Sequence, residues 1–446
     1  MKMKRAVLYY LRFFARLSLS IYKPKVIGIT GSVGKSSTRN AVYAMMKDYF
    51  RVRAIKEGNS ETGIPLGILG INPGHYRLPD WLRIMATAPF KLNNIKNVDY
   101  LIVEMGIDSP FSPKNMDYLL TIVKPDVAVV LNVHPVHTMQ FDQLLDPGLG
   151  GEKRLEFIIK RITKEKLKII TMARPKIGII NESLMLRPAQ GSATELVEFG
   201  KNDKTDIKFL SYEVDLKKTS FKYLLTKTND AIEIIVNGFV LPRGYQEVFA
   251  AAIAVGKSLS MENDRIRSGI SKNFSLPAGR GSILKGINSS IVIDSSYNAS
   301  KASVFTYLEL AKGISEKEKR PLVLVLGDMR ELGEETKTEH EQVAEKISAL
   351  GADRLYCLGP NTKKYIIPKL KEKIKEVRGF NTALEAGDYL LKSLPYRSIV
   401  LVKGSQNEIF LEEAVKKILK DKTDQKKLCR QNDFWIKRKK RFFQGE

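Results

Sequence analysis

Cysteine, histidine and tryptophan are scarce in this chain, which has only 2 Cys, 4 His and 2 Trp among its 446 residues. The two cysteines, Cys357 and Cys429, lie far apart in the sequence. Their spacing excludes a disulfide framework and a C-x-x-C metal site. So few thiols are typical of proteins from a reducing compartment, and we expect a cytoplasmic protein.

The chain also lacks an uninterrupted apolar run of the roughly 20 residues that a membrane-spanning helix needs. Its most apolar stretch, residues 6–22, is interrupted by Arg12 and Arg16, which share one helical stripe with Arg5. No small-residue cleavage site follows, so a signal peptide is not expected. Two interpretations remain open: a helix that lies on an anionic membrane, or a helix docked on the body of the protein.

Acidic residues are scarce at both ends of the chain. Residues 1–25 hold seven Lys and Arg and no acid, and residues 426–446 hold eight against Asp433 and Glu446. The net charge is +25, and more than half of it lies in these ends. The body is therefore only mildly basic, which argues against a nucleic-acid groove across the protein. We expect no nucleic-acid partner, and peripheral contact of the ends with a membrane stays open.

Residues 26–37, VIGITGSVGKSS, have the pattern of a phosphate-binding loop between a strand and a helix. Backbone N–H groups and a helix N-terminus at such a junction stabilise anionic oxygens. Lys35 is expected to bind the β- and γ-phosphates, and Ser36 to bind Mg²⁺. The common loop, G-x-x-x-x-G-K-[ST], has glycine where this chain has Ile29, so the loop is a shortened form. The residues expected to bind nucleotide here are Gly31, Ser32, Gly34, Lys35, Ser36 and Ser37.

Short β-branched runs alternate with helical segments from residue 24 onward. This alternation is typical of parallel sheets covered by helices on both faces. Residues 207–240 alternate instead like antiparallel strands, and a Pro/Gly-rich stretch at 275–282 marks a boundary. We therefore predict an α/β fold with four parts: an N-terminal helix (1–23), a central P-loop ATPase domain with a mostly parallel sheet (24–277), a C-terminal Rossmann-like α/β domain (278–425) and a basic tail (426–446).

Two further elements follow predicted strands. Glu104 ends the strand at 100–105, at the sheet edge where open α/β folds bind ligands, and could hold a metal or be an ordinary surface acid. His134 and His137 lie in the loop after the strand at 127–133. A histidine beside a phosphate site can be a metal ligand or an acid–base group, or simply a solvated loop residue. Lys153 is unremarkable on its own.

Taken together, these segments resemble the Mur ligases, the ATP-dependent amide-forming enzymes that build peptidoglycan stem peptides. The resemblance rests on five motifs in the same order: T-G-S-V-G-K-S-S (30–37), N-S-E-T-G-I-P (59–65), V-E-M-G (103–106), L-N-V-x-x-x-H (131–137) and K-R-L-E-F (153–157). The family carries the shortened loop. Later segments, at 278–282, 293–300, 325–334 and 402–406, are most similar to the members that add D-alanyl-D-alanine.

The resemblance implies that a substrate carboxylate attacks the γ-phosphate of ATP, and that an amine then displaces phosphate from the acyl phosphate. It implies two Mg²⁺ ions, with Ser36, Glu104, His137 and a carbamylated Lys153 as metal ligands. The implied catalytic residues are Lys35, Glu104, His137 and Lys153. ATP contacts from the second half are implied for Arg280, Asp294, Tyr297 and Asn298. The implied substrate contacts are Asn59, Thr62, Lys403 and Ser405.

The chain departs from the family pattern in several places. Ser300 and Lys301 stand where Asn-Pro is usual, Gln406 stands where Arg is usual, and only about 23 residues precede the first strand, too few for the family's UDP-sugar domain. We expect a monomer that joins D-Ala-D-Ala to a muramyl-tripeptide. The alternatives are a lipid-linked muramyl, folate or polypeptide acceptor, a non-catalytic Mur-like binding protein, and a P-loop NTPase acting on nucleic acid.

Overall fold

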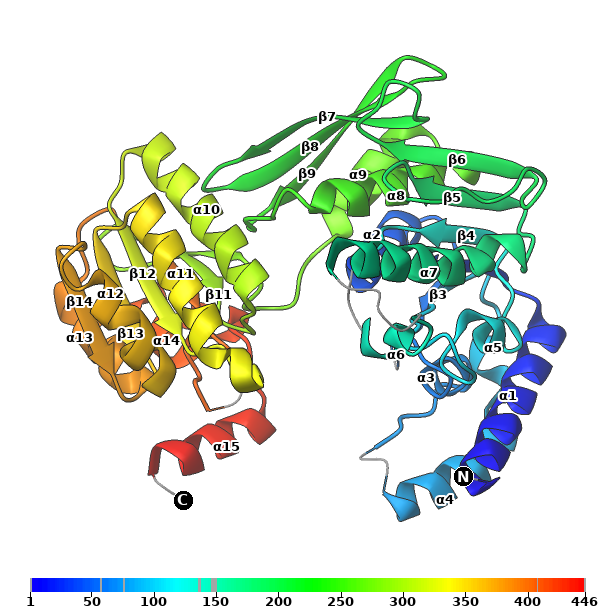
Figure 1. The fold of residues 1–446 in the computed structure, drawn as a ribbon, viewed down its shortest axis with the longest axis horizontal. Coiled ribbons are helices and arrows are strands. Elements are labelled where there is room, and N and C mark those ends of the chain that lie inside the picture. The colour runs from blue at the N-terminus through cyan, green and yellow to red at the C-terminus, as the bar shows by residue number, and fades with distance from the viewer. Residues whose placement is uncertain are drawn as a thin grey trace. The chain divides into compact units, whose positions relative to one another are not determined.

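The computed structural model describes residues 2–56, 58–74, 77–134, 138–145, 151–406 and 408–444. The chain forms two compact units (Figure 1). The first consists of residues 1–212, 221–235 and 244–274, and the second of residues 213–220, 236–243 and 275–446. The chain thus passes between the units more than once before it stays in the second.

A nine-stranded sheet in the order β2-β3-β1-β4-β5-β6-β7-β8-β9 organises the first unit. Its pairs from β2 to β7 are parallel. Strands β7, β8 and β9 are joined by residues 215–217 and 226–229, which are hairpin-length connections typical of antiparallel neighbours. The strands are β1 (Lys25–Thr30), β2 (Val52–Ala54), β3 (Tyr100–Glu104), β4 (Val127–Val130), β5 (Ile177–Asn181), β6 (Glu195–Gly200), β7 (Ile207–Val214), β8 (Lys218–Leu225) and β9 (Asp230–Asn237).

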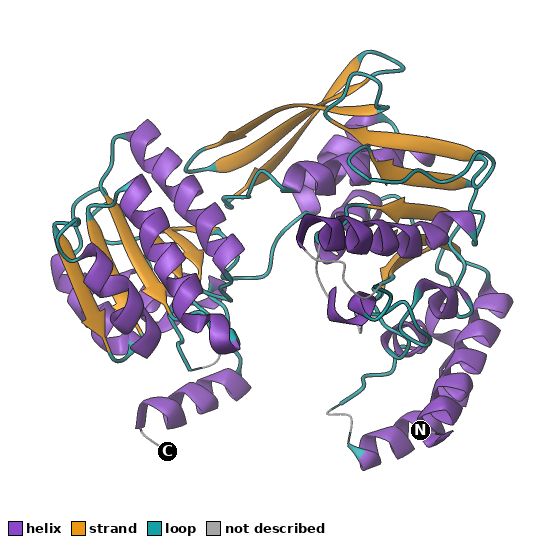
Figure 2. Cartoon of the chain, in the orientation of Figure 1, coloured by secondary structure: helices purple, strands orange, loops and turns teal. Residues whose placement is uncertain are grey.

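Helices cover this sheet (Figure 2). On α7 (Gly151–Thr171), Ile158, Ile162 and Ile169 pack in one cluster with buried side chains of β1, β3 and β4. Helix α2 (Lys35–Met46) packs against α8 (Tyr245–Ser258) and α9 (Asn263–Asn273). The other helices of this unit are α1 (Lys2–Tyr22), α3 (Gly63–Leu69), α4 (Leu78–Thr87), α5 (Met116–Leu120) and α6 (Thr138–Asp142), with the 3-10 helix η1 (Ala88–Ile95).

The N-terminal helix α1 is docked on the first unit. Its side chains at Leu8, Leu11, Ala15 and Ser18 are buried. Leu11 packs in a cluster with residues of α3, α4 and η1. The Ser18 hydroxyl donates a hydrogen bond to the carbonyl of Leu92, at 2.6 Å. Of the two interpretations of this segment, the structure therefore shows docking, by one helical stripe.

The second unit is built on a six-stranded sheet in the order β10-β11-β15-β12-β13-β14. Only β10 (Ser282–Lys285) is antiparallel to its neighbour; the parallel strands are β11 (Ile291–Ser295), β12 (Leu322–Gly327), β13 (Arg354–Leu358), β14 (Glu376–Phe380) and β15 (Ile399–Lys403). Alternate residues of β12 belong to two separate apolar clusters, so both faces of the sheet are buried. The predicted α/β class with mostly parallel sheets is confirmed.

Helices cover both faces of the second sheet. The clusters on the two faces contain residues of α10 (Lys301–Glu318) and α11 (Thr336–Leu350) in one, and of α13 (Ala383–Ser393) and α14 (Glu412–Ile418) in the other. The remaining elements are η2 (Gly333–Glu335), η3 (Thr362–Ile366), α12 (Ile367–Leu370), η4 (Lys422–Lys427) and α15 (Asp433–Gln444).

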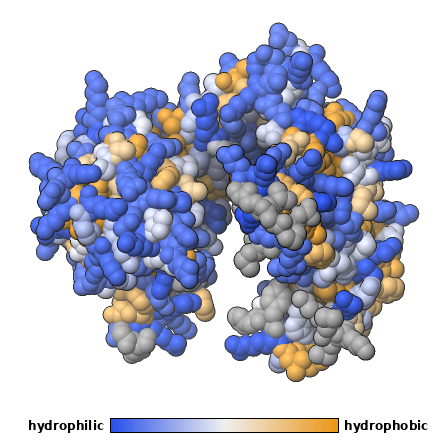
Figure 3. Space-filling model, in the orientation of Figure 1, coloured by the Kyte–Doolittle hydropathy of each residue, from blue (hydrophilic) through white to orange (hydrophobic). Residues whose placement is uncertain are grey.

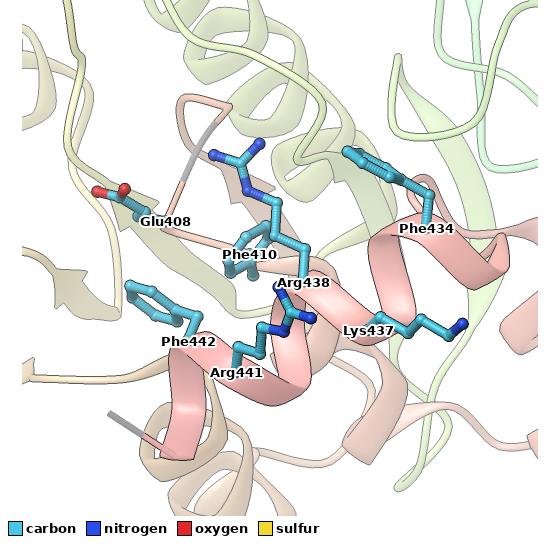
Figure 4. A pocket seen from close by; sticks show the side chains of 7 residues that line it. All are labelled: Glu408, Phe410, Phe434, Lys437, Arg438, Arg441 and Phe442. Carbon is cyan, nitrogen blue, oxygen red and sulfur yellow. The ribbon is translucent and has the colours of Figure 1, made fainter. Parts of the chain in front are cut away.

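The described part of the basic C-terminal segment folds onto the second unit. Arg430 is buried, and its guanidinium donates to both carboxylate oxygens of Glu412, at 2.9 Å each. Helix α15 lies beside Phe410, where Phe434, Arg438 and Phe442 surround a pocket (Figure 4). Long-range contacts therefore hold the described part of the segment that the sequence predicts to be a basic tail.

Candidate active site

The loop between β1 and α2 has the close packing that its glycines permit. Gly34 caps α2 with φ of 89°, a left-handed conformation that favours glycine. A Cβ atom on Gly31 would lie 2.9 Å from the Cβ of Leu131 on the neighbouring chain segment. The loop therefore passes directly over the end of the sheet, and the first N–H groups of α2 are available to an anion.

A side chain after β4 holds the loop in shape. The Ser32 N–H donates to the Asn132 carbonyl, and the Val33 N–H donates to Asn132 Oδ1, both at 2.9 Å. Asn132 Nδ2 in turn donates to Glu247 Oε2 on α8, at 2.8 Å. Asn132 and Glu247 were missed as site residues from the sequence. Asn132 lies inside the quoted L-N-V motif, which was the available signal, whereas Glu247 reaches the loop only through the fold.

Lys35 lies over the loop that precedes it. Its Nζ atom donates to the carbonyls of Gly31 and Ser32, at 2.8 and 3.2 Å. Burial lowers the pKa of Lys35, and the carboxylates of Glu104 and Asp108 partly oppose this shift. At the same end of α2, the Ser37 hydroxyl donates to the Tyr245 hydroxyl, at 3.3 Å. The ammonium thus lies at the mouth of the loop, where the carboxylates of Glu104 and Asp108 favour its charged form.

Ser36 and Glu104 form the pair most suited to a metal ion. The Ser36 hydroxyl donates to Glu104 Oε2 at 2.9 Å, and the buried Glu104 carboxylate also pairs with Arg39 at 2.6 Å. Hydroxyl and carboxylate oxygens are ligands that Mg²⁺ prefers, so the donor set fits this ion. Within the described residues, no group of three or more His, Cys, Asp or Glu side chains is placed to hold a metal. The pair would therefore need water, substrate oxygens or further ligands.

The remaining predicted residues of the first unit lie on other segments than the loop and α2. The carbonyl of Asn59 accepts the N–H of Gly106 at 2.8 Å, which puts Asn59 beside the end of β3 and Glu104. Thr62 directly precedes α3, and its carbonyl accepts the Leu66 N–H at 3.2 Å. Lys153 lies on the first turn of α7 with an exposed side chain. His137 falls outside the described residues, and its role stays a prediction.

A buried lysine on α7 was missed by sequence reasoning. Lys166 follows Ile162 by one turn on the helix face that packs on the sheet, and its side chain is only 3% exposed. No hydrogen bond or ion pair holds its ammonium within the described chain. Burial lowers the pKa of Lys166 to about 7; Lys35 lowers it further, and Asp108 and Glu165 oppose. The signal was a lysine at an apolar position of the helical repeat.

The second unit gathers several predicted residues at the ends of β11 and β15. The Lys403 ammonium is buried and donates to the Asn298 carbonyl at 2.8 Å and to the Ser295 hydroxyl at 3.3 Å. The Ser405 hydroxyl donates to Asn298 Oδ1 at 3.2 Å. Burial lowers the pKa of Lys403 to about 7; Arg280 adds to the shift and Asp294 opposes it. These side chains converge because β11 and β15 are parallel neighbours.

Asp294 and Arg280 flank this group. Asp294 is fully buried; its Oδ1 accepts the Ser296 N–H at 3.1 Å, while its Oδ2 has no hydrogen-bond partner among the described residues. Burial raises the pKa of Asp294 to about 6. The Arg280 guanidinium stacks over the Tyr297 ring, 4.5 Å from its centroid. Arg430, which sequence reasoning missed, donates to the carbonyl of Tyr297 at 3.1 Å and so supports the same segment.

Fold and loop together define a P-loop, α/β nucleotide-binding protein with two α/β units. Comparison with known families is more specific. Residues 29–146 match the Mur ligase middle domain, and residues 279–406 match the Mur ligase glutamate ligase domain. The chain belongs to the Mur ligase family and is an ATP-dependent ligase by class. The family resemblance predicted from the order of the motifs is thereby confirmed.

Two curated relatives that carry the same name are similar to this chain. The chain is 28% identical to the UDP-N-acetylmuramoyl-tripeptide–D-alanyl-D-alanine ligase of Rickettsia prowazekii, over 86% of this chain and 76% of that protein. For the enzyme of the same name from Synechocystis the identity is 26%, over 76% of this chain and 63% of that protein.

Two solved structures share the fold. MurF from Acinetobacter baumannii superposes with a TM-score of 0.68 at 17% identity, over 93% of this chain and 80% of that one. MurF from Thermotoga maritima in complex with ADP superposes with a TM-score of 0.65 at 22% identity, over 92% of this chain and 83% of that one. At these identities the likeness concerns the fold alone.

Proposed function

We propose that this protein joins D-alanyl-D-alanine to a muramyl-tripeptide in peptidoglycan precursor synthesis, at the cost of one ATP. The observation that carries the proposal is the Ser36–Glu104 pair beside Lys35, at the mouth of a glycine loop within the region that matches the Mur ligase middle domain. The names of the similar curated proteins supply the substrates.

The chemistry requires a carboxylate to become a good electrophile. The substrate carboxylate attacks the γ-phosphorus of ATP, ADP leaves, and the acyl phosphate forms. The amine of the incoming dipeptide then attacks the acyl carbon, so that an amide bond forms and phosphate leaves. The protein contributes charge neutralisation and positioning.

Each predicted residue has a role in this proposal. Lys35 and the N-terminal amides of α2 neutralise the β- and γ-phosphates. Ser36 and Glu104 would hold Mg²⁺, which when bound would supply positive charge that neutralises the phosphates. His137 and a carbamylated Lys153 are proposed ligands of a second Mg²⁺. Asn59 and Thr62, beside the end of β3 and the start of α3, are proposed contacts of the carboxylate substrate.

The second unit is proposed to bind ATP and the amine substrate. Arg280 and Tyr297 offer a stacked cation and ring, and Asp294 with Asn298 offers hydrogen-bonding groups. Lys403 and Ser405 are proposed contacts of the incoming dipeptide. The protein is proposed to work in the cytoplasm as a monomer, with peripheral contact of its N-terminal helix or basic C-terminal segment with the membrane.

Phosphate release from ATP tests the proposal. Purified protein is assayed with Mg²⁺, UDP-muramyl-tripeptide and D-Ala-D-Ala, and then with each substrate omitted. Release that needs both substrates supports the proposal, and the absence of turnover with every muramyl acceptor contradicts it. Turnover only with a lipid-linked, folate or polypeptide acceptor would keep the ligase class and replace the substrate.

Two lysine variants test the role of Lys35 in this assay, one at Lys35 itself and one as its control. Lys35→Ala should reduce kcat by at least about 100-fold, because a preorganised cation on transferring phosphate is worth several kcal/mol. Lys47→Ala removes an exposed lysine just beyond the other end of α2 and should leave the rate unchanged. Equal rates for the two variants would contradict the role of Lys35.

A further inference from the structure

The first unit carries an exposed apolar surface on α1, α4 and the start of η1, here called the α1–α4 face. Its members are 57–83% exposed, far more than large apolar side chains of a folded core. Of the ten residues of α4, only Ile84 is buried. Large apolar side chains that are exposed in one part of a protein surface mark an interaction site. The face consists of Tyr9, Phe13, Leu78, Leu82 and Phe90.

The fold holds these side chains together. The Tyr10 hydroxyl donates to the Met85 carbonyl at 2.8 Å, which joins α1 to α4. Tyr9 and Phe13 are four residues apart on α1, as Leu78 and Leu82 are on α4, so each pair shares one side of its helix. Figure 1 shows α4 beside the N-terminal half of α1, and Figure 3 shows apolar surface at that end of the unit.

The charges around the face are almost all positive. Arg5 and Arg16 are exposed on α1, and Arg83 and Lys91 are exposed on α4 and η1. The one acid on these three helices is Asp80, whose carboxylate accepts the N–H of Arg77 at 3.1 Å as part of a helix cap. An anionic partner therefore meets no uncommitted acid on these helices.

A cationic groove lies at the other end of α1. Its lining includes Arg16, Lys23, Lys25 and Lys124. The single acid in the lining, Asp126, accepts the Val26 N–H at 2.8 Å and is used within the fold. Phosphate groups suit such a groove. The outer side of α1 thus runs from apolar, aromatic side chains to a cluster of cations.

We propose that the α1–α4 face binds the surface of a bilayer that contains anionic phospholipid. Apolar side chains flanked by cations are the pattern of helices that lie in the interface, with the apolar groups below the headgroups and the cations beside the phosphates. No helix of the described chain is both long and apolar enough to cross a membrane. Because the inner stripe of α1 is packed in the core, only the outer side contacts lipid.

This inference assigns the membrane contact proposed above to the α1–α4 face. It does not depend on the proposed ligase reaction, so it can be tested without an activity assay. Co-sedimentation of the full chain with vesicles tests it. The vesicles are phosphatidylcholine alone, or phosphatidylcholine mixed with phosphatidylglycerol. The wild-type protein should pellet with the mixed vesicles, and less so at high salt, because salt screens the attraction between the cations and the lipid phosphates.

Matched variants locate the contact. Leu82→Glu should lower the partition coefficient by about tenfold or more, since burial of one leucine contributes about 1.5–3 kcal/mol. Leu391→Glu makes the same change at an exposed leucine of α13 and should bind like the wild type. Both sites are exposed, so equal melting temperatures show that the variants are folded. Equal pelleting of Leu82→Glu and wild type, or no pelleting of wild type, would overturn the proposal.

The fluorescence of the two tryptophans distinguishes lipid contact through this face from lipid contact through α15. In a Trp435→Phe protein only Trp81, on α4, remains, and its emission should shift to the blue with mixed vesicles. In a Trp81→Phe protein only Trp435, on α15, remains, and no shift is expected. A shift confined to Trp435 would assign the contact to α15 and overturn the proposal. So would gel filtration that shows a dimer dispersed by Leu82→Glu, because the face would then be an interface between copies.

Discussion

At the scale of single residues, the candidate site depends on buried charges with different degrees of compensation. Glu104 is held by Ser36 and Arg39, so its ionised form has partners on both oxygens. Lys166 has no such partner in the described part of the chain, and burial is the largest cause of its lowered pKa. The carboxylate of Glu104, held in this way, is suited to binding a metal cation. The buried ammonium of Lys166 lowers the stability of the fold unless an anion binds beside it, because an unpaired charge is unfavourable in a protein interior.

Glu104→Gln tests the proposed metal site. The amide keeps the hydrogen bond from Ser36 but loses the negative charge, so the apparent affinity for Mg²⁺ should fall by roughly tenfold or more. The measurement is the Mg²⁺ concentration that gives half-maximal activity. Glu156→Gln changes an exposed acid on α7 and should leave that concentration unchanged. If both variants behave like wild type, Glu104 does not bind the metal.

Lys166 predicts a pH dependence of stability. Its pKa is about 7 in the folded protein and near 10.5 in the unfolded chain, so the unfolded state binds the extra proton between these values. The free energy of unfolding should therefore rise as the pH increases from about 7 to 10, by about 1.4 kcal/mol per pH unit for this group. Lys403 is shifted in the same direction and adds a similar slope.

Lys166→Met should remove the contribution of this one group and raise stability at pH 7. Urea unfolding at a series of pH values measures the slope. Lys160→Met, at an exposed position of the same helix, serves as the control and should retain the wild-type slope. A wild-type slope in Lys166→Met would show that the buried ammonium does not titrate in this range.

At the scale of elements, segments that read as separate in the sequence are fastened by a few buried contacts. Glu412 on α14 binds Arg430, and the same carboxylate lies 3.5 Å from Lys439 on α15. These contacts connect α14, the segment after η4, and α15. The division of the chain at 277/278 and 425/426 stays a prediction. Residues 426–444 nevertheless contribute side chains to the interior of the second unit.

Arg430→Met should destabilise the second unit by about 3–5 kcal/mol, because Glu412 would lose its closest cation while buried. Thermal and denaturant unfolding measure the change. Arg438→Met, at an exposed arginine of α15, should cost less than about 1 kcal/mol. A similar small loss in both variants would mean that the Arg430–Glu412 pair contributes little to stability.

At the scale of the whole molecule, α1 is part of the core rather than an appendage. Leu11 on its inner stripe is fully buried among Leu66, Leu69, Ile84 and Ala88. Leu11→Ala should therefore destabilise the protein by about 2–5 kcal/mol. Ile21→Ala, at an exposed position of the same helix, should change stability by less than about 0.5 kcal/mol. The melting temperatures of the two variants provide the comparison.

Deletion of residues 1–23 gives a stronger form of the same prediction. It would uncover the apolar surface beneath α1, so the truncated protein should aggregate or melt at a lower temperature. Gel filtration and a thermal scan measure these outcomes. A truncated protein as soluble and stable as the full chain would show that α1 adds little to the core. Point variants on the outer side of α1 are therefore the better test of membrane binding.

Much of the candidate site could be predicted from the sequence because its signals are local. The loop at Gly31–Ser37, the strand that ends at Glu104 and the alternation of strands and helices each occupy one continuous segment. Parallel strands then bring their carboxyl ends to one edge, as they do for Lys403 and Asn298 in the second unit. Asn132 and Lys166 occupy positions with a local signal, but the sequence does not show their contacts. The bond of Asn132 to Glu247 and the burial of Lys166 depend on packing between distant segments.

The sequence alone determined the α/β class, the phosphate loop and the family, since local periodicity and motif order encode them. Only the tertiary structure decided that α1 is docked, that Arg430 is a buried partner of Glu412, and that exposed side chains of α1, α4 and η1 form one face. The physical reason is that an amphipathic or basic segment can contact water, lipid or protein equally well by composition. Which of them it contacts depends on the apolar surface that the rest of the fold presents to it.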